Sequence, residues 1–144
     1  MPEVSLRITA RSETDSRLVV RAGKHQMIVD EPESAGGTDT GPTPLQYLLA
    51  SVVGCVFVVG QIVAEEMGIK LRGVEMTAKS SLNPDRLRGR PTKDRAGLKG
   101  VSIEVNVDSD ADRQTLEKWL RTVESRCPVA DNLLAPTPVE VHLA

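Results

Sequence analysis

The sequence predicts an α+β fold in which helices gather on an antiparallel sheet. Three observations support this class: short β-rich segments flank the helical ones, one helical segment is apolar on nearly every side, and turn residues separate the first strands closely enough for hairpins. A chain of 144 residues has the length of one ordinary domain, and it shows no internal repeat. We therefore expect a single domain over residues 1–144.

The chain opens with three predicted strands, over residues 4–10, 17–23 and 25–30, separated by the turn segments SETD and AGK. Residues 30–44 follow with three prolines and three glycines, a composition that predicts a loop instead of regular structure. A loop of this length in a compact domain is usually functional or disordered.

A long helix is predicted over residues 45–67. Thr43 suits the N-cap, Pro44 suits the first helical position, and a glycine follows the last apolar residue. The segment is long enough to cross a bilayer, but polar residues and glycines interrupt it and no basic residue anchors either end. A helix buried in a soluble protein fits this pattern better than a membrane span.

Small side chains lie four residues apart on two adjoining stripes of this helix, as the pairs Ala50 and Gly54, and Ser51 and Cys55. Small residues allow another helix to approach closely. A monomer of this length has difficulty covering a long apolar helix on every side, so we infer a partner chain.

Two longer strands are predicted over residues 69–82 and 97–107. The segment between them, residues 83–97, carries five basic and two acidic residues. We expect it to form a solvated hairpin loop, with an anion-binding site as the alternative.

The last part of the chain is predicted to hold a helix over residues 109–126, capped by Ser109 or Asp110, then a short helix and a final strand over residues 138–144. Four side chains at helical spacing form the apolar stripe of the longer helix: Leu116, Trp119, Leu120 and Val123.

Composition narrows the function classes. The net charge of −2 and the presence of only three aromatic residues argue against nucleic acid as a partner. No signal peptide is visible at the N-terminus, so we expect a cytoplasmic protein that binds no membrane. His25 and His142 show no metal-ligand spacing with the two cysteines, and no nucleotide motif is present, so no metal and no cofactor are expected.

The two cysteines, Cys55 and Cys127, are the candidate reactive groups. Pro128 suits the first position of a helix, which makes Cys127 its N-cap; a helix N-terminus and the neighbouring Arg126 both favour a thiolate. Cys55 lies in mid-helix without this support, so local physics favours Cys127 as the more readily ionised thiol. Two buried, unreactive thiols are the alternative.

Three segments in order resemble the OsmC/Ohr family, the osmotically inducible and organic hydroperoxide resistance proteins: DEPESAGGTDTGPTPLQYLLASVVGC, then GIKLRGVEM, then CPVADNLL. The resemblance runs over nearly the whole chain. It implies an intertwined homodimer in which antiparallel sheets wrap around long central helices, with each site at the interface. Such a dimer would supply the partner chain inferred above.

The resemblance also implies the roles of the cysteines. Carried over by position, Cys55 attacks a hydroperoxide and becomes a sulfenic acid, and Cys127 condenses with it to a disulfide. The expected substrate is an organic hydroperoxide, whose alkyl group suits the apolar surroundings of Cys55. The reductant implied by relatives is a dithiol of the lipoyl type.

Two departures from the family pattern set the alternatives. The family's hydroperoxide reductases place a glutamate after the proline that opens the central helix, whereas this chain has Leu45 and Gln46. The arginine that this glutamate orients has three candidates here, Arg11, Arg17 and Arg21, of which Arg21 is favoured. The alternative functions are a redox sensor or apolar-ligand-binding dimer with little turnover, and a stable dimer whose cysteines are merely packed.

Overall fold

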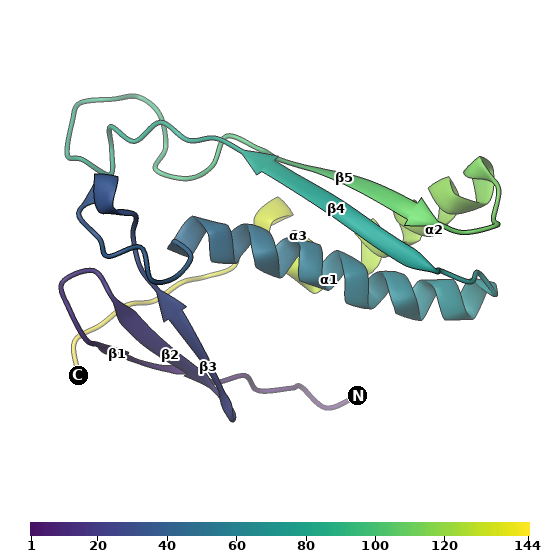
Figure 1. Ribbon diagram of the computed structural model, residues 1–144, viewed down its shortest axis with the longest axis horizontal. Helices are drawn as coiled ribbons and strands as arrows, with labels where there is room; N and C mark the ends of the chain where they lie inside the picture. Colours follow the sequence, from purple (N-terminus) through teal and green to yellow (C-terminus); the bar gives the residue numbers. More distant parts are fainter. The chain divides into compact units, whose positions relative to one another are not determined.

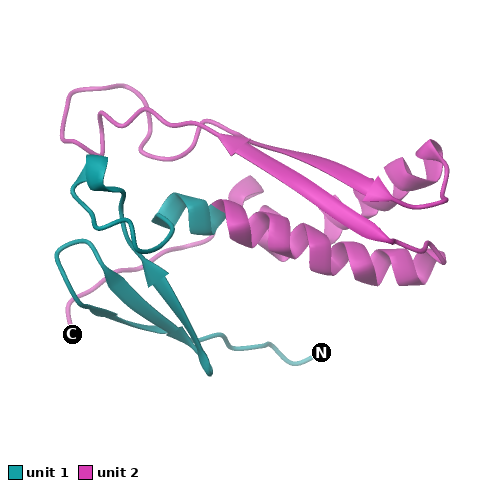
Figure 2. Ribbon diagram, in the orientation of Figure 1, with its two compact units in different colours: residues 1–48 teal, residues 49–144 magenta.

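A computed structural model describes residues 1–144, and the chain divides into two compact units, residues 1–48 and 49–144 (Figure 2). The protein consists of five strands, three α-helices and one short 3-10 helix, and every strand pairing is antiparallel. The predicted α+β class is confirmed. The expectation of a single domain over residues 1–144 stays a prediction.

The first unit holds a three-stranded sheet in the order β1-β2-β3 (Figure 1), built from β1 (Thr9–Ser12), β2 (Leu18–Ala22) and β3 (His25–Val29). Two tight connections make the hairpins, and Gly23 adopts φ +60° in the second one, a conformation that glycine adopts without strain.

The first strand begins later than the sequence predicted. Residues 4–8 are not in a strand, and β1 starts at Thr9 opposite Arg21. The reason is the register: Ala22, the last residue of β2, falls opposite Ile8, so the residues before Ile8 extend past the end of that strand. The alternation of apolar residues in this segment is real, but it lacks a partner within the unit.

The loop after β3 is irregular, as predicted, except for the single 3-10 turn η1 (Glu33–Ala35). It leads into α1 (Pro44–Met67), which begins with a reciprocal cap. The amide of Thr43 donates to Oε1 of Gln46 at 2.8 Å, and the amide of Gln46 donates to Oγ1 of Thr43 at 3.3 Å. This capping box satisfies two amide groups that a helix start leaves without partners.

Helix α1 ends as predicted, because Gly68 takes φ +67° directly after Met67. The helix is long and apolar enough to cross a membrane by length and composition alone, a property that core helices of soluble proteins share. One face of it is buried within the chain, through Val52, Val56, Val59, Gly60, Val63 and Ala64.

In the second unit, β4 (Gly73–Ser80) and β5 (Val101–Asp108) form a two-stranded hairpin ladder, close to the predicted positions. Side chains alternate between a half-buried and an exposed face along both strands. The half-buried rows pair Val74 with Val107, Met76 with Val105 and Ala78 with Ile103, and residues of these rows pack against the hydrophobic core.

Helix α2 (Arg113–Arg126) has its N-cap two or three residues later than predicted. The cap is Asp112, whose carboxylate accepts from the amide of Thr115 at 2.8 Å, and not Ser109 or Asp110. The hydroxyl of Ser109 instead accepts from the amide of Ala111 and holds the turn that precedes the helix. All three residues are good caps, so composition could not choose among them.

The core of the second unit forms where α1 meets α2. Trp119 is buried and donates from Nε1 to the carbonyl oxygen of Gly60 at 2.8 Å. A Cβ atom on Gly60 would lie 2.9 Å from Cζ2 of Trp119, so a glycine is needed for this close approach. Val123 and Val63 are fully buried beside them in the same cluster.

The predicted final strand is wrong. After α3 (Pro128–Leu134), residues 136–144 form no strand, and the apolar side chains of Val139, Val141 and Leu143 are exposed. The alternating pattern that predicted a strand requires a sheet edge to pair with, and this segment pairs with none in the chain.

Candidate functional site

The structure brings the two cysteines together, although 72 positions separate them in the sequence. Cys55 lies on α1 and packs against the core cluster that contains Cys127. Both are free thiols, Cys55 half-buried and Cys127 buried, and the Cys127 thiol is within hydrogen-bonding reach of Cys55. The proximity that the family resemblance implied is therefore present in a single chain.

The first turn of α3 serves both sulfur atoms. Cys127 is the N-cap of α3, as predicted, and its Sγ accepts from the amide of Ala130 at 3.5 Å. The amide of Val129 donates to the sulfur of Cys55. Two successive backbone amides thus point to two thiols, one on the helix itself and one from α1.

Burial nevertheless raises the pKa of Cys55 above the ordinary value of a cysteine, and the hydrogen bond with Cys127 raises this pKa further. The Val129 amide acts in the opposite direction but does not outweigh them. Within this chain Cys55 is therefore held as a neutral thiol at pH 7. Attack on a peroxide requires the thiolate, so this site needs a cation close to Cys55.

Arg126 does not supply that cation. Its guanidinium makes a bidentate ion pair with Glu66 of α1, at 2.6 Å and 3.1 Å. The pairing lowers the pKa of Glu66 and joins the end of α2 to the end of α1. The sequence placed Arg126 beside Cys127 as a possible activator, whereas the structure shows it engaged with a carboxylate.

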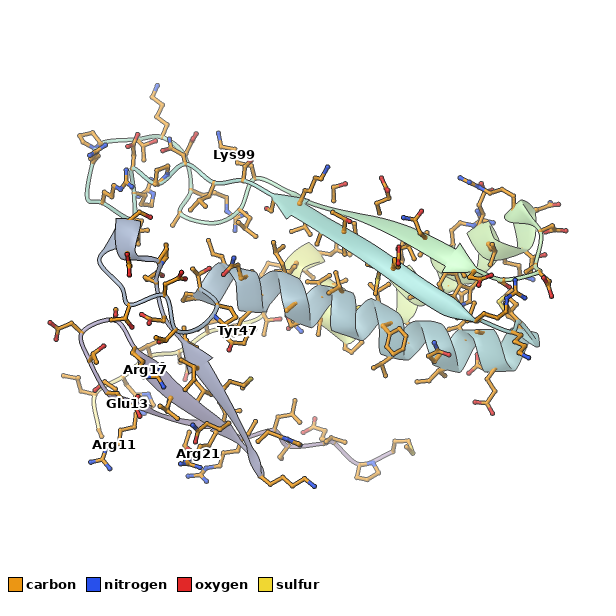
Figure 3. The ribbon with its side chains drawn as sticks, in the orientation of Figure 1. Arg11, Glu13, Arg17, Arg21, Tyr47 and Lys99 are labelled. Atoms are coloured by element: carbon orange, nitrogen blue, oxygen red, sulfur yellow. The ribbon has the colours of Figure 1, made fainter.

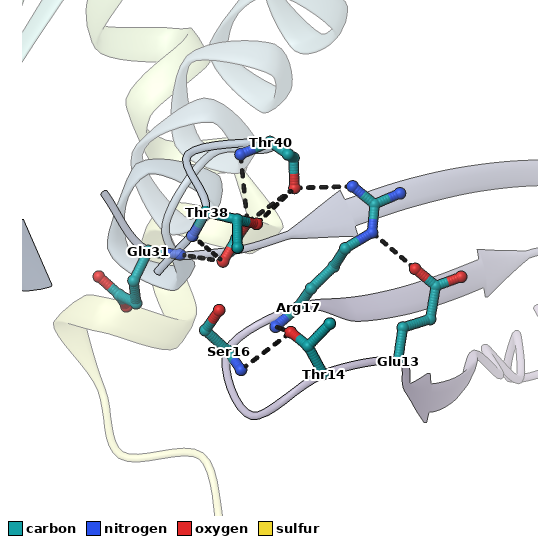
Figure 4. Close-up of polar contacts among 8 residues, drawn as sticks. Glu13, Thr14, Ser16, Arg17, Glu31, Thr38 and Thr40 are labelled. Carbon is teal, nitrogen blue, oxygen red and sulfur yellow. Dashed lines mark hydrogen bonds and ion pairs between the residues drawn. The ribbon is translucent and has the colours of Figure 1, made fainter. Parts of the chain in front are cut away.

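The loop of the first unit holds a second polar centre that the sequence did not reveal. Asp30 is fully buried, and its carboxylate accepts from the amides of Glu31, Thr38 and Thr40, at 2.8, 3.4 and 3.1 Å (Figure 4). The hydroxyls of Thr38 and Thr40 donate to the same carboxylate, and a bond from Ser16 adds to them. These donors hold the pKa of Asp30 far below its usual range.

Arg17 is attached to this centre from outside. Its Nε donates to Glu13 at 2.6 Å and its Nη1 donates to the hydroxyl of Thr40 at 2.7 Å (Figure 4). The Thr40 hydroxyl in turn donates to Asp30 at 2.7 Å. A continuous chain of hydrogen bonds therefore connects an arginine, a hydroxyl and a buried carboxylate, and it fixes the direction of the guanidinium.

The three candidate arginines thus differ in their contacts. Arg17 is held by Glu13 and Thr40, whereas Arg11 on β1 and Arg21 on β2 make no ion pair and no side-chain hydrogen bond (Figure 3). All three belong to the first unit, and both cysteines belong to the second. The role of Arg21 as the activator of Cys55 stays a prediction.

The position of the family's glutamate has a different use here. The side chain of Gln46 accepts a hydrogen bond from the amide of Thr43 in the capping box, and Leu45 is exposed. Tyr47, in the same turn, donates its hydroxyl to the carbonyl oxygen of Ile28 at 2.5 Å. The first turn of α1 is therefore fastened to the preceding loop and strand by neutral groups.

No group of three or more His, Cys, Asp or Glu side chains converges to hold a metal ion. The two thiols meet beside the first turn of α3, and the Asp30 centre is a polar support of the loop before α1.

Comparison with known proteins places this geometry in a family. The family model described as OsmC-like protein matches residues 37–142, which cover both cysteines and all of α1. No curated protein matches the sequence significantly.

Solved structures with the same fold include the OsmC-like protein from Mycoplasma pneumoniae, with TM-score 0.82, 20% identity, and coverage of 94% of this chain and 91% of that one. The organic hydroperoxide resistance protein OhrB of Bacillus subtilis matches with TM-score 0.64 and 24% identity, over 92% of this chain and 93% of that one. An organic hydroperoxide resistance protein from Elizabethkingia anophelis, with crystallant-derived thiocyanate bound, matches with TM-score 0.67 and 16% identity, over 94% and 91% of the two chains.

Proposed function

The chain belongs to the OsmC-like protein family, and from this premise we propose that it is a thiol-dependent peroxidase that reduces organic hydroperoxides. The observation that carries the proposal is the meeting of Cys55 and Cys127 within hydrogen-bonding reach, from two segments far apart in the sequence. Cys55 is half-buried and so accessible in part, whereas Cys127 is buried. This is the arrangement that a peroxidatic and a resolving thiol require.

The proposed reaction has three balanced steps. The Cys55 thiolate attacks one peroxide oxygen of ROOH, the O–O bond breaks, and the alkoxide leaves as ROH after taking a proton, so that Cys55 becomes a sulfenic acid. The Cys127 thiol then attacks this sulfur and water leaves, which forms the Cys55–Cys127 disulfide. An external dithiol, of the lipoyl type by family resemblance, restores both thiols by exchange.

Organic hydroperoxides are favoured over hydrogen peroxide by the surroundings of Cys55. Its neighbours in the core cluster are apolar, with Val56 and Val59 on α1 and Val129 and Ala130 on α3. Moving an alkyl group from water onto such a surface is favourable by about 25 cal/mol per Å² of apolar surface buried. Hydrogen peroxide has no alkyl group and gains nothing from it.

The proposal includes a homodimer. The face of α1 that the chain leaves open holds Ala50, Ser51, Gly54, Phe57, Val58, Gln61 and Ile62. Phe57, Val58 and Ile62 remain 44%, 57% and 45% exposed, and nothing lies within 4 Å of a Cβ built on Gly54. A second copy packed on this face would cover the apolar residues, and the small ones would allow the close approach. We place the dimer in the cytoplasm, where free thiols stay reduced.

A steady-state assay with cumene hydroperoxide and dihydrolipoamide tests the peroxidase. Wild type should turn over, Cys55→Ser should fall to the rate without protein, and Cys127→Ser should oxidise once without recycling. Peptide mapping under non-reducing conditions should show the Cys55–Cys127 disulfide after one equivalent of hydroperoxide. Turnover that survives Cys55→Ser would sink the proposal.

The raised pKa of Cys55 favours a second candidate, an oxidation sensor or apolar-ligand-binding dimer with little turnover. A neutral thiol reacts slowly with peroxide, and the glutamate position is occupied by a capping residue. Stoichiometric oxidation of Cys55 that no dithiol reverses would support this candidate over the peroxidase.

A further inference from the structure

The three-stranded sheet places two arginines on one face. In its register Arg11 lies opposite Val19, and Arg21 lies opposite Thr9 on one side and Gln26 on the other. Residues paired across an antiparallel ladder share a face, and so do residues two apart on one strand. Arg11 and Arg21 are therefore diagonal neighbours on adjacent strands.

Neither arginine is neutralised by the chain. The carboxylate nearest in sequence, Glu13, lies on the same face but is taken by the Nε of Arg17 at 2.6 Å. Arg11 and Arg21 make no ion pair with any residue, although the chain has more acidic than basic side chains. Like charges placed close together on a sheet are destabilising. An anion bound between Arg11 and Arg21 would relieve this repulsion, and the chain itself places no carboxylate there.

The same face is hollowed. A pocket of about 400 Å³ is lined by Thr9, Ala10, Arg11, Glu13, Val19, Arg21 and Gln26, all within the first unit. Three of these residues, Arg11, Glu13 and Arg21, are labelled in Figure 3. Val19 is buried and forms its apolar floor. Around this floor lie two guanidinium groups, a hydroxyl and a carboxamide, so that donors outnumber acceptors; the one carboxylate present is already paired.

We propose that this pocket binds a small organic anion whose carboxylate or phosphate group lies between the guanidinium groups of Arg11 and Arg21. Guanidinium groups match oxyanions through paired N–H donors. The volume exceeds that of a single oxyanion and falls in the range of small-molecule sites, so the remainder of the ligand lies over Val19. The thiol chemistry is not part of this site, and the inference does not rest on the peroxidase activity.

The site also bears on the choice of the arginine that activates Cys55. If Arg21 serves the anion pocket together with Arg11, its guanidinium is required on the sheet face and both arginines should contribute to binding equally. If Arg21 serves Cys55, its loss should slow oxidation of the thiol, and Arg11 alone should bind no anion. The two roles therefore give different results for the same pair of variants.

Nuclear magnetic resonance titration of the full-length protein carrying Cys55→Ser tests the site without interference from thiol oxidation. The probes are succinate, its neutral analogue succinamide, and inorganic phosphate, at constant ionic strength. Succinate should shift the Nε signals of Arg11 and Arg21 and the amides of β1–β3 with saturation, and succinamide should leave them in place. Phosphate in place of succinate distinguishes a phosphate ligand from a carboxylate one.

Matched variants complete the experiment. Arg11→Gln and Arg21→Gln should each weaken succinate or phosphate binding by at least about fivefold, because each removes a charged donor. Arg88→Gln removes the same charge from an exposed arginine of the β4–β5 loop and should change the affinity by less than about twofold. Equal weakening in all three, or no saturating shift at the two arginines with either anion, would overturn the site.

Discussion

Two ionisable groups of this protein are removed from water, and their pKa values are shifted in ways that favour opposite forms: the charged form of Asp30 and the neutral form of Cys55. Asp30, in the loop of the first unit, is fully buried and accepts hydrogen bonds from three amides and from hydroxyl groups, and its pKa is far below the usual range. Cys55, on α1 of the second unit, is half-buried among apolar side chains with one amide donor, and its pKa is raised.

The difference teaches that burial alone does not decide which form of a group the fold favours. Desolvation acts against the charged form at both positions. At Asp30 the donors outweigh it, so the carboxylate is stable and chemically inert. At Cys55 a single amide does not, so the fold stores a neutral thiol whose charge must be induced by another group. The Asp30 carboxylate thus has a complete set of hydrogen-bond donors for its charge. The Cys55 sulfur has an incomplete set, because a single amide donates to it.

The largest expected effect, on the melting temperature, comes from a substitution that leaves some of the donors around Asp30 without an acceptor. Asp30→Asn replaces one acceptor oxygen with an NH₂ donor that faces the donors of Thr38 and Thr40. We expect the melting temperature to fall by more than about 5 °C, since buried donors lose their acceptor. Thermal unfolding followed by circular dichroism measures this.

Asp39→Asn is the matched control, because it removes the same charge from the same loop. Asp39 has φ +53° and asparagine tolerates this conformation. Its melting temperature should change by less than about 2 °C. If both variants lose the same stability, the effect comes from the charge of the loop and not from the bonds to Asp30.

The acid limb of stability should show the same centre. The folded pKa of Asp30 lies below the unfolded value of about 4. A lowered pKa stabilises the folded state at pH values above the unfolded pKa, and this stability is lost as the pH falls through and below about 4. Urea unfolding between pH 7 and pH 2.5 should show a steeper loss in wild type than in Asp30→Asn. Parallel acid limbs in the two proteins would contradict this assignment.

A smaller effect is expected when a single donor is removed. Thr40→Val deletes the hydroxyl that donates to Asp30 and accepts from Arg17. We expect the melting temperature to fall by about 2–5 °C and the Nε signal of Arg17 to broaden, because the guanidinium loses one of its two partners. Thr14→Val, which removes a hydroxyl that accepts from the amide of Arg17, should leave the Asp30 bonds intact. A sharp, unmoved Arg17 signal in Thr40→Val would show that Glu13 alone positions this arginine.

The sequence predicted the elements that carry their own start and stop signals. Helix α1 was found from Thr43, Pro44 and the following glycine, and the Cys127 cap was found from Pro128, because caps act over a few residues. The meeting of the two cysteines came from family resemblance and not from any local pattern. The Val129 amide beside Cys55 was missed, because a backbone donor leaves no signal in a sequence.

The Asp30 centre was missed for a related reason. Its partners Thr38 and Thr40 stand eight and ten residues later in a loop, a spacing that no helix or strand period marks. The two misplaced strands, residues 4–8 and 138–144, have the alternation of a strand but lack a sheet edge in this chain. Alternation predicts the face that a segment presents, and pairing depends on a partner elsewhere.

The smallest expected effect is on the pKa of Cys55 when Cys127 is replaced. Here the substitution should favour the charged form of the group, whereas the changes around Asp30 disfavour it. The hydrogen bond that the Cys55 thiol donates to the sulfur of Cys127 raises the pKa of Cys55, so Cys127→Ala should lower that pKa toward the ordinary cysteine value without reaching it, because burial still raises it. Cys127→Ser keeps a hydroxyl at the cap and serves as the control, with a smaller change. Alkylation of the single remaining thiol by iodoacetamide, as a function of pH, measures both variants.

The pH dependence of stability should change with the pKa of Cys55. A raised thiol pKa stabilises the folded state below the unfolded pKa of about 8.5, and this stability is lost as the pH rises through the folded pKa. It should therefore be lost over a narrower pH range in Cys127→Ala than in wild type. An alkylation midpoint that moves upward in Cys127→Ala would show that Cys127 stabilises the Cys55 thiolate, and the contrast with Asp30 would then fail.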